Sequence, residues 1–114
     1  LRGAARDLMS DLSWGRIFPV NHGEAVNVLF EKTGYKIFLD DNKNGTVDAG
    51  ENVLRLSNYP PGVVMQKTTF PDAETAFYPS GTASPAGSVI LDRGSGTQIK
   101  IIVNLVGRVR VTNI

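Results

Sequence analysis

A twelve-residue acidic segment, from Asp40 to Glu51, is the feature that most constrains the fold of this chain. The residues before it, Tyr35 to Leu39, and those after it, Val53 to Leu56, alternate apolar and other side chains, as half-buried strands do. Asn, Asp and Gly fill the segment between them, and these residue types tolerate the backbone conformations of tight loops. The sequence therefore predicts a long β-hairpin with the acidic segment at its tip.

The same segment matches the calcium-loop pattern D-x-[DN]-x-[DN]-G-x5-E at every specified position. In this interpretation six residues supply oxygen ligands: Asp40, Asn42, Asn44, Thr46, Asp48 and Glu51. Gly45 would permit the sharp turn that gathers them. The strand-like flanks favour the alternative, an ordinary polar hairpin tip, because the standard calcium loop lies between two helices. Both interpretations stay open, and Ca²⁺ is the one cofactor that the sequence suggests.

Size, charge and the absence of cysteine exclude several classes of protein. A chain of 114 residues is long enough to bury a core as a single domain, residues 1–114. Without cysteine it has neither a disulfide framework nor a thiolate metal site. The net charge of +1 is close to zero, so binding of nucleic acid would require a local cluster of cations. No apolar run is long enough to span a bilayer.

The N-terminal part, residues 1–18, is predicted to be an amphipathic helix with one face for a sheet. Its apolar stripe has spacings of four, three and four residues: Leu1, Ala5, Leu8 and Leu12. Trp14 is expected to be a packing anchor, and Pro19 to end the helix. No capping residue precedes Leu1, so we expect this segment to be the C-terminal half of a longer helix.

About seven short strands are predicted in residues 25–114. The clearest are residues 25–30, 35–39, 53–56, 88–91, 98–104 and 106–112, with shorter candidates at 63–65 and 76–78. Most of the links between them have the length of hairpin turns. One helix followed by such strands predicts an α+β fold in which the helix packs on an antiparallel β-sheet.

The order of these features corresponds to that of a known family. Five pieces carry the correspondence: the helix ending near Ser13-Trp-Gly-Arg, the strand Ala25 to Phe30, residues 34–40 running into 42–51, residues 77–82, and the closing Gly107-Arg-Val-Arg-Val. Together they resemble the FimT and GspH type of minor pilins and pseudopilins, from bacterial type IV pili and type II secretion systems. The acidic hairpin tip and the closing Gly-Arg-x-Arg are the most specific pieces.

The resemblance implies a membrane-anchored subunit that joins other pilins or pseudopilins in a filament and contributes to its assembly or its tip. In that family the first half of the helix carries a leader cleavage site and an apolar segment, which holds the subunit in the inner membrane before assembly. The globular part would then lie in the periplasm and later in the pilus or pseudopilus. Many relatives carry cysteines and this chain has none, so no disulfide is carried over.

No catalytic residue is assigned from the sequence. The chain has no G-x-S-x-G, no glycine-rich phosphate loop before a helix and no cysteine nucleophile. Its single histidine, His22, is expected in the turn before the first strand, without a partner that would make it catalytic. The sequence therefore predicts a protein that is not an enzyme.

The last strand supports a second function, the binding of DNA. Arg108 and Arg110 are two residues apart, so both project from one sheet face, while Lys100 on the adjoining strand and Arg93 in the preceding turn extend the patch. Guanidinium groups hold phosphates without reading sequence. Some FimT-like pilins capture DNA for natural transformation through a C-terminal Gly-Arg-x-Arg, and the resemblance implies this role for Gly107, Arg108 and Arg110. The alternative is that these charges only prevent edge-to-edge strand pairing.

Overall fold

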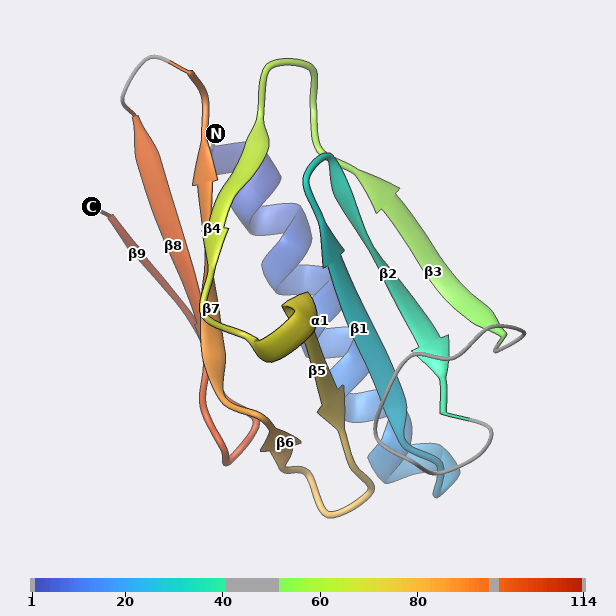
Figure 1. Cartoon of the computed structure of the whole chain (residues 1–114). Coiled ribbons are helices and arrows are strands. Elements are labelled where there is room, and N and C mark those ends of the chain that lie inside the picture. Colours follow the sequence, from blue (N-terminus) through green and yellow to red (C-terminus); the bar gives the residue numbers. More distant parts are fainter. Residues whose placement is uncertain (1, 41–51, 95–96, 114) are drawn as a thin grey trace.

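The computed structural model describes residues 2–40, 52–94 and 97–113, and shows one helix against two antiparallel sheets (Figure 1). The helix is α1 (Arg2–His22). The five-stranded sheet has the spatial order β3 (Val53–Asn58), β2 (Gly34–Leu39), β1 (Val26–Glu31), β5 (Glu74–Phe77) and β6 (Ala83–Ser84). The four-stranded sheet has the order β4 (Val64–Thr68), β7 (Gly87–Asp92), β8 (Gln98–Val103) and β9 (Val109–Asn113). The short 3-10 helix η1 (Pro71–Ala73) follows β4.

The α+β class is confirmed, but the prediction of one sheet with about seven strands was wrong in both numbers. The described residues form nine strands in two sheets. After β3 the chain leaves the first sheet, and β4 pairs with β7, about twenty residues further on. Alternation in the sequence identifies a strand but not its partner, so the division was not visible. The additional strand β6 has only two residues, too few to give a pattern.

The predicted end of the helix at Pro19 was also wrong, because α1 continues through this proline to His22. A proline inside a helix forfeits one backbone hydrogen bond and normally costs about 3 kcal/mol or more. Here Pro19 is buried, and the Gly23 N–H donates to its carbonyl at 2.8 Å, so the ladder resumes. Aromatic side chains four residues apart contact one another along the same stretch: the rings of Trp14 and Phe18 are tilted by 42° with centroids 5.2 Å apart, and Phe18 stacks on His22 at 4.0 Å. These contacts offset the loss.

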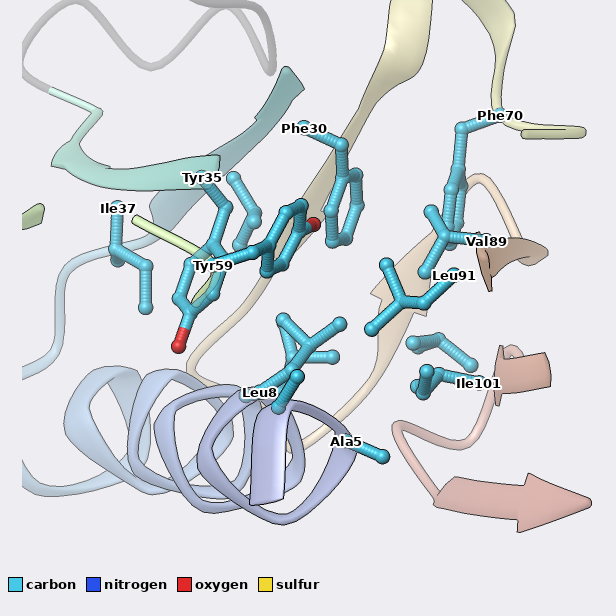
Figure 2. Close-up of a cluster of buried hydrophobic side chains, with 14 of the residues drawn as sticks. Ala5, Leu8, Phe30, Tyr35, Ile37, Tyr59, Phe70, Val89, Leu91 and Ile101 are labelled. Carbon is cyan, nitrogen blue, oxygen red and sulfur yellow. The ribbon is translucent and has the colours of Figure 1, made fainter. Parts of the chain in front are cut away.

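The core lies between α1 and the inner faces of both sheets (Figure 2). Leu8 and Leu12 of the predicted helical stripe are fully buried, and Ala5 is 2% exposed. Phe30 of β1 stacks on Phe70, just after β4, with ring centroids 5.1 Å apart. This pair links β1 of the five-stranded sheet to the segment that follows β4 of the four-stranded sheet.

The long hairpin predicted from the alternating segments is present as β2 and β3. Their register runs from Gly34 opposite Asn58 to Phe38 opposite Val53, and the Leu39 N–H donates to the Asn52 carbonyl at 2.8 Å. Residues 41–51, the predicted tip, lie outside the described residues. The pairing of β2 with β3 is thus confirmed over the residues that flank the acidic segment.

Candidate functional site

The two arginines of the closing motif lie on the outer face of the four-stranded sheet, which points away from the core. Val109 and Val111 of β9 pack against the core, whereas Arg108 and Arg110 are exposed. Neighbouring positions of a strand face opposite sides of a sheet, so the alternation assigns both arginines to the solvent side.

The turn between β8 and β9 fixes the backbone at the first of these arginines. Asn104 begins the turn: its carbonyl accepts the Gly107 N–H at 2.9 Å, and its Oδ1 accepts the Arg108 N–H at 2.9 Å. Gly107 has φ +82°, and a Cβ there would lie 2.4 Å from the Gly81 carbonyl oxygen and 3.1 Å from Nε of Arg16. Only glycine fits this conformation and this close approach. The motif's glycine is thus a structural requirement for presenting its arginines.

Lys100 joins the arginines on the same face. It lies opposite Thr112 of β9, while Ile102 lies opposite Arg110, so Lys100 and Arg110 are diagonal neighbours on adjacent strands. Arg93 does not join them. It lies in the β7–β8 turn, which is at the other end of the sheet from the β8–β9 turn (Figure 1). Measured along the strand direction, Arg93 and Arg110 are about five residues, roughly 17 Å, apart.

A shallow hollow of about 390 Å³ lies beside Lys100 on this outer face. It is lined by Thr69, Ala86, Gly87, Ser88, Lys100, Ile102, Val103 and Asn104. The Ser88 N–H donates to Thr69 Oγ1 at 2.8 Å, and the two hydroxyl oxygens are 3.3 Å apart. Among the described residues, the lining thus combines one ammonium group, two hydroxyls and an amide, and contains no carboxylate.

The carboxylate of Asp92 stands at the opposite end of the face, toward the β7–β8 turn. It accepts a hydrogen bond from Gln98 Nε2 at 2.9 Å and another from the Gly94 N–H. These two bonds lower the pKa of Asp92, the Gln98 bond more than the Gly94 bond. The carboxylate therefore stays ionised, and it limits the positive part of the face to the end that holds Lys100 and Arg110.

Comparison with known proteins places this architecture in a family. Residues 4–107 match the family model described as type II transport protein GspH. The chain belongs to this family. The match ends at Gly107, so Arg108 and the strand β9, which includes Arg110, lie beyond it. No curated protein sequence matches the chain.

Solved structures of a minor pilin and of a minor pseudopilin show the same fold. The type IV minor pilin FimU of Pseudomonas aeruginosa strain PAO1, in one crystal form, has a TM-score of 0.75 at 18% identity, covering 98% of this chain and 92% of that chain. A second crystal form gives the same score and identity over 87% of that chain. The minor pseudopilin EpsH of Vibrio cholerae has a TM-score of 0.77 at 12% identity, covering 98% of this chain and 95% of that chain. Minor pilins and pseudopilins are structural subunits, and the resemblance inferred from the sequence is confirmed.

The remaining predicted residues of this GspH-family chain are only partly described. Asp40 is 4% exposed, and its N–H donates to the Ala25 carbonyl at 3.0 Å. The other predicted calcium ligands, Asn42, Asn44, Thr46, Asp48 and Glu51, lie outside the described residues. Within the described ranges, no three His, Cys, Asp or Glu side chains are grouped as a metal site requires. Calcium binding stays a prediction.

His22 lies at the last position of α1 rather than in a turn, because the helix extends past Pro19. Its Nδ1 is 3.0 Å from the Phe18 carbonyl oxygen, and its ring stacks on that of Phe18. Both contacts are local to the helix end.

In the part of the chain that the structure describes, no helix has the length and apolarity that crossing a membrane would require.

Sequence reasoning missed one cation of the outer face, Lys67 of β4. It lies opposite Ile90 of β7, which in turn lies opposite Lys100 of β8. The sequence gives only a weak indication that Lys67 belongs to this face. Lys67 is 33 residues from Lys100, and the side of the sheet that its side chain faces depends on an irregularity in β4. The outer cationic face is therefore Lys67, Lys100, Arg108 and Arg110.

Proposed function

We propose that this chain is a minor subunit of a type IV pilus or of a type II secretion pseudopilus, where it contributes to filament assembly or to the tip. Its membership of the GspH family and its fold support this role. Its partners would be the other pilins or pseudopilins of the filament. The globular domain would lie in the periplasm, with an inner-membrane anchor of the kind that the family carries at its N-terminus.

The observation that carries the proposal is a group of exposed apolar side chains at one end of the domain. Four are more than half exposed: Ile17 at 56%, Val20 at 54%, Leu105 at 59% and Val106 at 63%. The first two lie in the last turns of α1 and the other two in the β8–β9 turn. The Arg16 side chain, just before Ile17, lies beside the turn, with its Nε 3.1 Å from the ideal Cβ position of Gly107. Large apolar side chains exposed at one end of a domain are typical of protein contact surfaces.

The test is complementation of a strain that lacks this subunit. The wild-type gene is compared with a variant carrying Ile17→Ser and Val20→Ser, and surface pili and secreted protein are both measured. The matched control is Leu56→Ser, on β3, whose side chain is 63% exposed. We expect the double variant to lose filament assembly and the control to retain it. Normal filaments and secretion in the deletion strain would refute the proposal.

A second candidate function is the binding of DNA, and the exposure of Arg108 and Arg110 on one face beside Lys100 favours it. Three cations that share a face can neutralise phosphates, and such binding weakens steeply with salt. We expect the domain to bind DNA at low salt, and Arg108→Ala with Arg110→Ala to abolish that binding. No binding by the wild-type domain at low salt would reject this candidate and leave the filament role.

A further inference from the structure

We infer that a phosphodiester backbone crosses the strands of the four-stranded sheet, from β9 over β8 to β4, with Lys67 as a contact residue and one phosphate seated in the hollow beside Lys100. This inference rests on the second candidate function and extends it beyond the closing motif. It assigns a role to a strand, a bulge and a hollow that the Gly-Arg-x-Arg motif does not include.

The strand register sets the spacing of the cations. Lys67 and Lys100 both lie opposite Ile90, one on each side of β7, so they share a row two strand spacings apart. That separation is about 9.5 Å between backbones. Arg110 is the diagonal neighbour of Lys100, at roughly 7–8 Å. Long side chains span such intervals, so the three cations form a continuous positive track across the sheet.

An irregularity in β4 is what turns Lys67 toward this track. Met65 lies opposite Leu91, and the register shifts before Lys67, which lies opposite Ile90. Without the extra residue, Lys67 would lie opposite Val89 and face the core, because a slip of one residue reverses every side chain. The bulged residue, Gln66, is instead held by Gln98, whose Nε2 lies 2.6 Å from Gln66 Oε1.

The hollow offers the groups that proteins use to hold a phosphate. Lys100 supplies charge, while Thr69, Ser88 and Asn104 supply hydroxyl and amide groups. Thr69 Oγ1 accepts the Ser88 N–H, which leaves the Thr69 hydroxyl proton to donate. Gly87, at the edge of the hollow, has no room for a side chain, because the ring of Phe70 packs 2.7 Å from where its Cβ would be.

The remaining side chains of the face predict how the backbone would be held. Ile90 and Ile102 occupy the positions between the cations, and isoleucine has no group that reads a base edge. Binding would therefore be insensitive to sequence. Asp92, in the row beyond Ile90, repels phosphate and confines the track to the Arg110 end of the sheet.

The experiment measures the salt dependence of binding to labelled oligonucleotides, single-stranded and duplex, for the wild-type domain, Lys67→Gln and the control Lys36→Gln. Lys36 is on the other sheet and pairs with Glu31 at 3.5 Å. Losing one phosphate contact lowers the slope of log K against log salt by about 0.9 on duplex and about 0.7 on single strands. We expect that decrease for Lys67→Gln and no change for Lys36→Gln.

A second pair of variants tests the hollow. Ala86 lies on its exposed rim, so Ala86→Glu adds a negative charge there and Ala86→Gln adds the same bulk without charge. We expect roughly tenfold weaker binding for Ala86→Glu than for Ala86→Gln, from repulsion of the seated phosphate. Each variant's melting temperature is compared with that of the wild type to verify folding.

The outcomes separate this inference from the function on which it rests. If the wild-type domain binds DNA through Arg108 and Arg110, but Lys67→Gln keeps the full salt slope and the two Ala86 variants bind alike, then the crossing track is wrong and DNA binding stands. If the domain binds no DNA at low salt, both are wrong. Inorganic phosphate is titrated as a separate arm, and saturable phosphate binding without DNA binding would make the hollow a site for the free ion and overturn the inference.

Discussion

The guanidinium group of Arg55 lies over the indole ring of Trp14, with its Cζ 4.2 Å from the ring centroid. Its Nη1 also donates to Asp11 Oδ1 at 2.6 Å, and the hydroxyl of Tyr35 donates to Asp11 Oδ2 at 2.5 Å. Arg55 belongs to the edge strand β3, whereas Trp14 and Asp11 belong to α1. This cluster of Arg55, Trp14, Asp11 and Tyr35 therefore links β3, the edge strand of the five-stranded sheet, to the helix.

Arg55→Ala is predicted to lower the free energy of unfolding by about 1–2 kcal/mol. A partly exposed cation–π contact contributes roughly 0.5–1 kcal/mol, and a partly exposed ion pair a similar amount. Arg55→Lys should lie between wild type and Arg55→Ala, because an ammonium group keeps the charge but loses the planar stacking. Urea unfolding at neutral pH measures both.

The matched control for this prediction is Lys36→Ala, which removes a solvent-exposed pair with Glu31. Such pairs contribute little, so we expect a change within about 0.5 kcal/mol. An equal effect of Arg55→Ala and Lys36→Ala would show that the contact with Trp14 does not stabilise the fold.

The hydroxyl of Tyr35 predicts a loss of stability at alkaline pH. Burial, and then the hydrogen bond to Asp11, raise the pKa of Tyr35 well above its ordinary value of about 10. Above pH about 10 the unfolded chain ionises this tyrosine while the folded chain keeps its proton. Stability then falls as pH rises toward the folded-state pKa, by up to about 1.4 kcal/mol per pH unit.

Burial also raises the pKa of Tyr59, so both tyrosines contribute to this alkaline slope. Tyr35→Phe should remove one of the two contributions and roughly halve the slope between pH about 10 and about 11. Urea unfolding at several pH values compares the variant with wild type. A wild-type stability that stays constant over this interval would contradict the prediction.

The parts of the fold that the sequence predicted are those that depend on local periodicity. The stripe of Leu8 and Leu12 predicted the buried helix face, and alternation around the acidic segment predicted the β2–β3 hairpin. The same rule assigned Arg108 and Arg110 to one exposed face. Each of these features is decided by residues within a few positions of one another, so a single sequence contains them.

The features that were missed depend on contacts between distant segments. The sheet is divided in two because β4 pairs with β7, and Lys67 faces outward because of a bulge that only this pairing defines. α1 continues through Pro19 because surrounding contacts offset the lost hydrogen bond. Periodicity gives the direction of a side chain relative to its own element, and it cannot give the partner that the element selects.

Calcium binding by the segment from Asp40 to Glu51 remains to be tested, and thermal unfolding tests it directly. An ion that binds only the folded chain stabilises it by RT ln(1 + [L]/Kd). We expect millimolar Ca²⁺ to raise Tm by several degrees, at about 4–8 °C for each kcal/mol, and Mg²⁺ to raise it less. Glu51→Gln, which removes the predicted bidentate ligand, should lose the effect. A Tm that does not change with Ca²⁺ would leave an ordinary polar hairpin tip.

The close approach at the β8–β9 turn predicts that Gly107→Ala is more damaging than a change at any open turn. Any side chain at φ +82° is strained by roughly 1 kcal/mol, and here the new Cβ would also lie 2.4 Å from the Gly81 carbonyl oxygen. Relief requires the turn to move away from the loop that holds Gly81. We expect a loss of at least about 2 kcal/mol in urea unfolding, together with altered placement of Arg108.

Gly94→Ala supplies the control, because Gly94 has nearly the same backbone conformation, φ +86°, and none of the described residues beyond its chain neighbours has an atom within 4 Å of its ideal Cβ position. Gly94→Ala is destabilised only by the unfavourable backbone conformation. The difference in free energy of unfolding between the two variants therefore isolates the contact with Gly81. Equal destabilisation would mean that the turn relaxes freely, and the glycine of the closing motif would then be explained by its backbone conformation alone. A larger cost at Gly107, with weaker DNA binding than in Gly94→Ala, would tie the geometry of the turn to the presentation of the arginines that follow it.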